Sequence, residues 1–317
     1  MSEIASIMPG VCLSAGMAFL ALLASSLHPS FDALLISPLI GVILGNFIEK
    51  KDWFEAGARF CVSRVLPVGL GLYGAQMVVR GPAMKFFLPY VLGAGLLFFI
   101  ITFLVARGFG LESGISLLLC AGLSIGGASA VSIISGAGGA GGDDLSVSLI
   151  SLWTVGLAGM LSMTFCPDAL GLAARKFALM LGAALPSLGL VKAASAYAGG
   201  HLAGIATSLK LIRTALLAPL IIGLYLAKKT VRLSGALVFL AVFSALALAV
   251  NLSGPAGLGL SRAIAPAGLP VLSVSLAALG FTVDFDSIAR KGVYPLLTAL
   301  FAWGISVLFI YLAVKAL

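Results

Sequence analysis

The chain has 317 residues, of which 61% are hydrophobic and 9% are charged, and its formal net charge is +8 with a mean hydropathy of +1.18. Soluble domains carry roughly a quarter charged residues, so most of this surface must face lipid. Backbone groups in lipid must be satisfied within helices or closed barrels, and uninterrupted apolar runs favour helices. The composition predicts an all-α polytopic membrane protein and leaves no room for a soluble catalytic or nucleic-acid-binding domain.

Apolar runs separated by Gly, Pro and charged residues predict about eleven transmembrane helices in a single membrane domain, residues 1–317. In chain order these spans are expected near 7–27, 33–48, 59–79, 86–106, 113–136, 146–165, 176–198, 205–227, 234–252, 264–283 and 293–314. Glu3 precedes the first run in place of basic residues, so this run is predicted to be a retained span and not a signal peptide.

The loop charges predict an orientation, because Lys and Arg concentrate in the short cytoplasmic loops of membrane proteins. With eleven spans, the side of the N-terminus has Lys50, Lys51, Arg59, Arg107, Arg175, Lys176, Lys228, Lys229, Arg232, Arg290 and Lys291. The opposite side has only Arg80, Lys85, Arg262 and Lys315. The ratio of eleven to four predicts a cytoplasmic N-terminus and an external C-terminus.

A repeated motif predicts two inverted repeats. The pattern Pro-x3-Gly-Leu-Tyr occurs at 67–73 in the third span and at 219–225 in the eighth. These spans cross the membrane in opposite senses, as in transporters built from inverted repeats. The predicted 5+5 arrangement has an extra helix at 1–29, repeat 1 at 30–166 and repeat 2 at 174–317. A rival offset pairs Gly74 with Gly280.

This repeat pairs the fifth and tenth spans, which are both rich in Gly, Pro and Ser. We expect two crossing discontinuous helices there, with exposed amides that bind an anion near the bilayer midplane. The candidate residues are Ser124, Gly126, Gly127, Ala128 and Ser129 in the fifth span and Ser275, Gly280 and Thr282 in the tenth. The alternative is that these small residues only let neighbouring helices pack closely.

Four cations, Arg64, Lys192, Lys210 and Arg213, lie within predicted spans, whereas all eleven acidic residues lie in loops or at span ends. A charge at the bilayer centre costs at least ~2.5 kcal/mol, so such cations usually face a cavity or a ligand. Arg213 and Lys192 are predicted to bind an anionic solute, with Arg64 a weaker candidate. The alternatives are that Lys210 and Arg64 snorkel to the interface, and that Arg213 and Lys192 bond to carbonyls of a broken helix.

Other chemistries have little support in the sequence. The four Cys residues show no metal-ligand spacing, and no His or acidic residue lies within a span, so we expect no metal, no cofactor and no enzymatic activity. Sodium and proton antiporters normally place carboxylates inside the membrane, so their absence argues against a cation exchanger.

Three segments resemble the bacterial YeiH-type family of proposed sulfate exporters, over nearly the whole chain. They are 123–131, 210–219, and 277–282 with the block 291–296. The resemblance implies kinship with cation/proton antiporters and bile-acid symporters, and hence an inverted-repeat fold with a moving core and a panel or dimerisation domain. In this chain Pro186-Ser187 replaces a His-Glu pair of the family and Gly126 replaces a Cys, which argues against carboxylate-based proton coupling.

The sequence thus predicts a secondary transporter that exports a small anion, such as sulfate, sulfite, an organosulfonate or a carboxylate, by alternating access. The alternative is a sodium- or proton-coupled symporter of a small organic solute. The expected partners are the solute and the lipid bilayer, nucleic acid is not expected, and a homodimer stays open.

Overall fold

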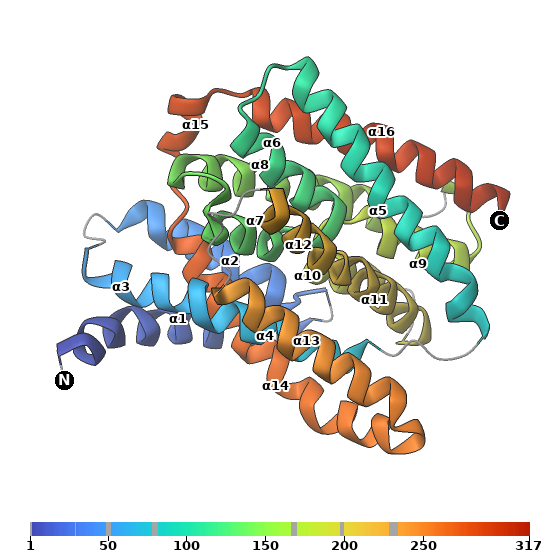
Figure 1. The fold of residues 1–317 in the computed structure, drawn as a ribbon, viewed down its shortest axis with the longest axis horizontal. Helices are drawn as coiled ribbons and strands as arrows, with labels where there is room; N and C mark the ends of the chain where they lie inside the picture. The colour runs from blue at the N-terminus through green and yellow to red at the C-terminus, as the bar shows by residue number, and fades with distance from the viewer. Residues whose placement is uncertain are drawn as a thin grey trace. The chain divides into compact units, whose positions relative to one another are not determined.

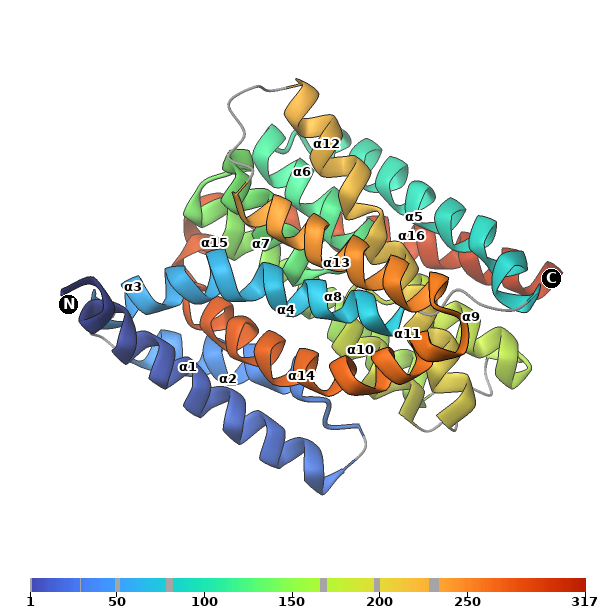
Figure 2. The same cartoon turned by 60° about the horizontal axis from the view of Figure 1, so that its bottom comes forward.

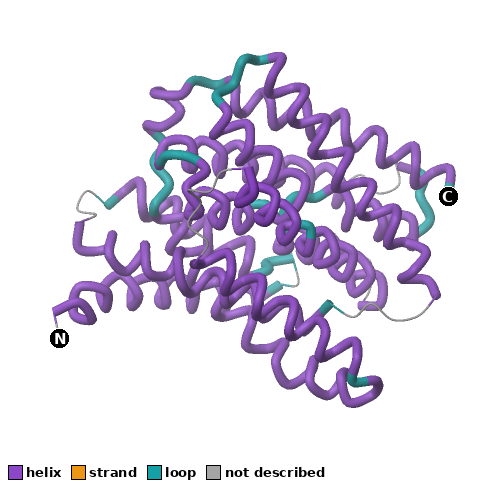
Figure 3. The backbone as a smooth tube through the Cα atoms, viewed as in Figure 1, coloured by secondary structure: helices purple, strands orange, loops and turns teal. Residues whose placement is uncertain are grey.

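The protein is described by a computed structural model that covers residues 2–28, 30–48, 52–77, 82–165, 170–196, 200–227 and 234–317. Over these residues the chain is helical with short turns and has no strand (Figure 3). The prediction of an all-α polytopic membrane protein is confirmed. Seven helices are long and apolar enough to cross a membrane: Ile4–Leu27, Leu88–Gly108, Gly142–Thr164, Leu202–Leu226, Gly235–Leu252, Ala256–Phe281 and Tyr294–Ala316.

The chain forms two compact units, and each contains segments of both predicted repeats. Unit 1 comprises residues 1–78, 136–138 and 230–285. Its elements are α1 (Ser2–Leu27), α2 (Ala33–Phe47), α3 (Asp52–Phe60), the π-helical η1 (Cys61–Val65), α4 (Leu66–Leu72), the 3₁₀ turn η2 (Tyr73–Gln76), α13 (Ser234–Leu252) and α14 (Gly254–Phe281). The division of the chain into 1–29, 30–166 and 174–317 stays a prediction.

Unit 2 comprises residues 79–135, 139–229 and 286–317. Its first elements are α5 (Pro82–Gly108), α6 (Ser113–Ala121), the π-helical η3 (Gly122–Gly126), α7 (Ala128–Ile134) and α8 (Gly142–Phe165). Between α7 and α8 lies η4 (Ser135–Gly139), of which residues 136–138 belong to unit 1. Its later elements are α9 (Ala174–Ala184), α10 (Leu188–Ser195), α11 (Gly200–Ala215), α12 (Leu217–Ala227), α15 (Asp286–Lys291) and α16 (Tyr294–Ala316). In this unit α16 packs beside α5 and α8 (Figure 1).

In unit 1, α14 is one continuous helix, so the predicted break in the tenth span is wrong. Figure 2 shows α14 beside α2 and α4. Glycines let α14 and α2 approach closely, because a Cβ on Gly280 would collide with the Pro38 carbonyl. Pro266 interrupts the backbone bonding, and the neighbouring Ala265 carbonyl accepts a hydrogen bond from the Gln76 amide at 3.3 Å.

The fifth predicted span is broken at Gly127, as expected, but the chain then doubles back. Gly127 has φ +62° and separates η3 from α7. A Cβ on Gly122 would lie 2.9 Å from Cγ2 of Val131, whereas nine residues of straight helix would separate these positions by about 13 Å. Residues 113–126 therefore form the first leg, and α7 begins the return leg, of a re-entrant hairpin.

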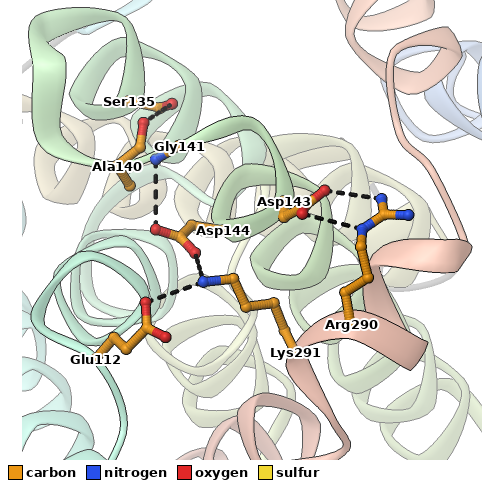
Figure 4. Close-up of polar contacts among 8 residues, drawn as sticks. All are labelled: Glu112, Ser135, Ala140, Gly141, Asp143, Asp144, Arg290 and Lys291. Carbon is orange, nitrogen blue, oxygen red and sulfur yellow. Dashed lines mark hydrogen bonds and ion pairs between the residues drawn. The ribbon is translucent and has the colours of Figure 1, made fainter.

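The ends of this hairpin confirm its course. Lys291 Nζ lies 2.9 Å from a carboxylate oxygen of Glu112, just before the first leg, and 2.9 Å from one of Asp144, just after the return leg (Figure 4). The chain therefore enters and leaves on the same membrane face. The first leg has a length of about 21 Å, which is too short to cross a hydrocarbon core of about 30 Å. The prediction that 113–136 crosses the membrane is wrong.

The same ion pairs decide the course of the seventh predicted span. Because Lys291 contacts Glu112, the chain must cross the membrane an even number of times between them. The helix α8, the pair α11 and α12, α13 and α14 supply four crossings. The segment of α9 and α10, which is interrupted at residues 185–187, therefore does not cross. It is a second re-entrant segment.

A second pair of contacts supports this conclusion. The Tyr311 hydroxyl donates to the Leu170 carbonyl at 3.1 Å, and Lys176 Nζ donates to the Lys315 carbonyl at 3.1 Å. The start of α9 therefore shares a face with the end of α16. Four crossings again separate them, without any crossing by α9 and α10. Within the described residues, two of the eleven predicted spans are thus re-entrant segments, and these enter from opposite faces.

This topology changes the number of basic residues on each face but not the orientation that they predict. Arg175 and Lys176 move to the face of the C-terminus, so eleven and four become nine and six. The two termini still lie on opposite faces. Six of the counted residues lie outside the described parts of the chain: Lys50, Lys51, Arg80, Lys228, Lys229 and Arg232.

Candidate functional site

The two re-entrant segments meet at their breaks. A Cβ added to Gly127 would lie 2.9 Å from the Pro186 carbonyl oxygen and 2.9 Å from Cβ of Ser187. Only a glycine fits here, because the position combines a positive φ with this close approach. Since the segments enter from opposite faces, they meet inside the membrane. We call residues 123–129 together with 183–187 the junction.

Lys210 of α11 is fully buried against the junction. Its side chain is 0% exposed, and Nζ donates to the Ile125 carbonyl at 2.9 Å. The Thr214 hydroxyl donates to the Lys210 carbonyl at 3.1 Å. The prediction that Lys210 snorkels to the interface is wrong, because the broken helix offers its ammonium group a carbonyl partner in the interior.

Arg213, one turn later on α11, is also 0% exposed and connects both re-entrant segments. Its Nε donates to the Ser124 carbonyl at 3.0 Å and its Nη2 to the Leu123 carbonyl at 2.6 Å. Its Nη1 donates to the carbonyl of Ala183, at the end of α9. The guanidinium also lies 5.0 Å from the ring centroid of Phe98. The predicted alternative, in which Arg213 bonds to carbonyls of a broken helix, is confirmed.

These contacts follow from the way the two helices end. The last carbonyls of a helix have no partner within it, and they carry the negative end of the helix dipole. The first leg ends in π-helical η3, and α9 ends at Ala184 before Pro186. Lys210 and Arg213 supply donors and positive charge to both ends at once.

The junction serines bond to the backbone of their own segments. The Ser124 hydroxyl donates to the Cys120 carbonyl at 2.5 Å, and the Ser129 hydroxyl donates to the Gly126 carbonyl at 3.0 Å. In the other segment, Ser187 is the N-cap of α10 and its hydroxyl accepts from the Leu190 amide at 3.4 Å. Both breaks are therefore stabilised locally.

The junction unites part of the predicted site. Ser124, Gly126, Gly127, Ala128, Ser129 and Arg213 lie there. Lys192 lies on α10 and is half-buried, away from the tip of its segment. The remaining predicted residues belong to unit 1: Arg64, Ser275, Gly280 and Thr282.

In unit 1 these residues bond to their own helix, pack against a neighbouring helix or are exposed. The Ser275 hydroxyl donates to the Leu272 carbonyl at 3.0 Å, and the Thr282 hydroxyl donates to the Leu279 carbonyl at 2.7 Å. Gly280 allows close helix packing, and the Arg64 side chain is exposed on η1. The alternative of close packing by small residues therefore describes Gly280.

Sequence reasoning missed the second break and the burial of Lys210. The available signal was Pro186 in the middle of a predicted span, since proline removes a backbone donor and frees carbonyls in the preceding turn. Lys210 and Arg213 lie three residues apart and so share a helix face, which could have placed both on one site.

The junction contains two cations without an acidic partner in the described part of the chain. The cations that form ion pairs with acidic side chains elsewhere in the described residues include Arg59, Arg290 and Lys291. Carbonyl dipoles at two helix ends compensate part of the charge, because each end is equivalent to about half an elementary charge. The arrangement therefore favours a negatively charged ligand.

Comparison with known proteins places the chain in a family of membrane proteins. The family described as Conserved hypothetical protein 698 matches residues 9–299. A UPF0324 membrane protein of Archaeoglobus fulgidus is 27% identical over 288 residues, which cover 90% of this chain and 85% of that protein. The UPF0324 inner membrane protein YeiH of Escherichia coli K12 is 27% identical over 324 residues, covering 93% of this chain and 90% of YeiH. No solved structure matches. The chain is a member of the Conserved hypothetical protein 698 family.

Proposed function

We propose that this protein is a secondary transporter of a small anion, which binds at the junction. The observation that carries the proposal is the burial of Lys210 and Arg213 where the two re-entrant segments meet. Non-helical backbone at membrane depth is tolerated only where it is buried in protein or lines an aqueous cavity. Transporters commonly form their substrate sites from interrupted helices of this kind.

The two cations have donors to offer an anion. A guanidinium has five N–H donors, and three groups of Arg213 bond to carbonyls, which leaves two donors. An ammonium group has three, and Lys210 uses one for Ile125, which leaves two. A planar carboxylate or a tetrahedral oxyanion accepts two parallel bonds from Arg, and Lys adds a point charge. Sulfate, sulfite, organosulfonates and carboxylates all fit this chemistry.

The finer features of the proposal rest on the sequence. Export of sulfate or a related anion, and kinship with the cation/proton antiporter and bile-acid symporter superfamily, follow from the family resemblance. The charge count favours a cytoplasmic N-terminus and an external C-terminus. The name of the YeiH relative supports an inner-membrane location. In this proposal the protein is not an enzyme, functions in the bilayer without nucleic acid, and is open to homodimerisation.

A thermal-unfolding screen of the purified protein tests the proposal. The ligands are sulfate, sulfite, thiosulfate, sulfonates, carboxylates, sodium and neutral solutes. A ligand at a hundred times its Kd adds about 2.7 kcal/mol to the stability. We expect one class of anion to raise the unfolding temperature. Proteoliposomes that contain the protein should take up the same anion in labelled form.

The variants must separate binding from folding, because Arg213 also supports three carbonyls. Arg213→Lys and Lys210→Gln retain one or more donors. Each is expected to raise the apparent Kd for the anion, obtained from the shift in unfolding temperature, at least tenfold. Arg64→Gln is the matched control, since it removes another cation from a predicted span and should bind normally. Stabilisation by sodium or neutral solutes alone would contradict the proposal and favour the coupled symporter.

A further inference from the structure

A separate cluster of charges lies where the hairpin enters and leaves the membrane face. Figure 4 shows Lys291 of α15 between Glu112 and Asp144, with both distances to Nζ at 2.9 Å. The neighbouring Arg290 makes two bonds to Asp143, at 2.8 and 3.0 Å. One short helix thus binds the residue that precedes the first leg and the first turn of α8, which follows the return leg. We call Glu112, Asp143, Asp144, Arg290 and Lys291 the mouth cluster.

The mouth cluster is partly shielded from water. The side chain of Asp144 is 12% exposed and that of Lys291 is 23% exposed, whereas Glu112 is 66% exposed. Asp144 is held in place because its other oxygen accepts from the Gly141 amide at 3.3 Å. Its first-turn position in α8 also favours a negative charge. The Asp144 bridge is therefore the stronger of the two, and the Glu112 bridge is weakened by solvent.

The backbone between the return leg and α8 has few side chains to hold it. Five glycines occur in this stretch: Gly136, Gly138, Gly139, Gly141 and Gly142. A Cβ on Gly136, Gly141 or Gly142 would meet no atom within 4 Å. At the other end of the return leg, Gly127 has φ +62°, which glycine adopts without strain. Glycines therefore lie at both ends of the return leg.

We propose that α15 is an ionic latch that holds the hairpin closed. While Lys291 bridges Glu112 and Asp144, both legs stay fixed and the junction is shielded from the face where the hairpin enters. When the bridges break, the return leg moves and the junction becomes accessible from that face. The latch explains how an anion would reach Lys210 and Arg213, so its purpose rests on the proposed function. Its opening can be measured without transport.

Cysteine accessibility tests the latch. Ser132, on the return leg, is 4% exposed and is replaced by Cys after the native cysteines Cys12, Cys61, Cys120 and Cys166 have been changed to Ala. We expect Lys291→Gln to raise the rate of modification by a membrane-impermeant thiol reagent at least tenfold. Lys291→Arg should keep the slow rate, because it retains the charge.

A matched control removes a different ion pair. Arg59 pairs with Glu55 at 3.1 Å on the surface of unit 1, so Arg59→Gln should leave the labelling rate unchanged. Salt should accelerate labelling in the parent and have little effect in Lys291→Gln, because it screens exposed ion pairs. Glu112→Gln removes only the exposed bridge and serves if Lys291→Gln does not fold; we expect a severalfold increase.

The latch is wrong if Ser132→Cys is labelled equally slowly in three proteins of normal thermal stability: the one that retains Lys291 and Glu112, the one with Lys291→Gln and the one with Glu112→Gln. This outcome is distinct from failure of the proposed function. Faster labelling without any stabilising anion would support the latch and contradict anion transport. Stabilisation by an anion without faster labelling would do the reverse.

Discussion

Gly127 lies directly against Pro186, so the breaks of two re-entrant segments touch although 59 residues separate them in the chain. The first segment enters from the face of Glu112 and the second from the face of Leu170. No single leg of either segment is long enough to cross the membrane. Their contact creates a buried polar region between opposite faces.

Gly127→Ala is expected to destabilise the protein by about 1–3 kcal/mol, since φ +62° is strained for any residue with a Cβ. The close approach of Pro186 adds overpacking to this strain. Thermal unfolding in detergent measures the effect. Gly93→Ala in α5 is the control, because a Cβ there meets no atom within 4 Å. Equal unfolding temperatures for both variants would show that the tip relaxes.

Arg213→Gln is expected to cost about 1–3 kcal/mol for each helix-end carbonyl that loses its donor, because Arg213 donates to three carbonyls and the shorter Gln has only two N–H donors. Lys210→Gln should cost less, since Lys210 bonds to a single carbonyl. Urea or thermal unfolding of the purified variants distinguishes them. The exposed Arg64→Gln should change the stability by less than about 0.5 kcal/mol. A similar loss in all three would indicate a general charge effect.

Single cysteines test the topology directly. Glu112→Cys and Gly141→Cys should react with an impermeant reagent from the same face, whereas a crossing fifth span would place them on opposite faces. Arg175→Cys should react from the face of the C-terminus. With eleven crossings, Arg175→Cys would react from the face of the N-terminus instead.

Gly280→Ala is expected to destabilise unit 1 by about 1–3 kcal/mol, because the new Cβ would collide with the Pro38 carbonyl of α2. Gly259→Ala in the same helix is the matched control, since no atom lies within 4 Å of its Cβ. It should be neutral or stabilising, because alanine favours helix. Unchanged stability in Gly280→Ala, measured by thermal unfolding, would contradict the packing role.

The latch should stay closed as the pH rises from about 7 to about 9. The hydrogen bonds that Lys291 donates to Asp144 and Glu112 raise the pKa of Lys291 above its usual value of 10.5. A raised pKa means that the cation stabilises the folded state below 10.5 and loses this effect only as the pH rises through the folded-state value. The reactivity of any thiol rises with pH in this range, so the labelling rate of Ser132→Cys with Lys291 present is divided by its rate in Lys291→Gln at the same pH. This ratio should stay constant between about pH 7 and about pH 9. A steep rise within this window would contradict the role of Lys291.

The sequence by itself determined the fold class, because a chain with so few charges can satisfy its backbone in lipid only through helices. It also located the break at Gly127 and the presence of Arg213 within a span, since both signals are local: paired glycines and an isolated cation.

The tertiary structure alone decided which apolar segments cross. Length and hydropathy do not distinguish a span from a hairpin of two legs. The return is revealed by the close approach of Gly122 to Val131 and by the shared contact of Glu112 and Asp144 with Lys291. It also decided that Lys210 is buried, because the carbonyl that binds it comes from a residue 85 positions away. Such partners depend on how distant helices pack, which the spacing of residues along one helix does not encode.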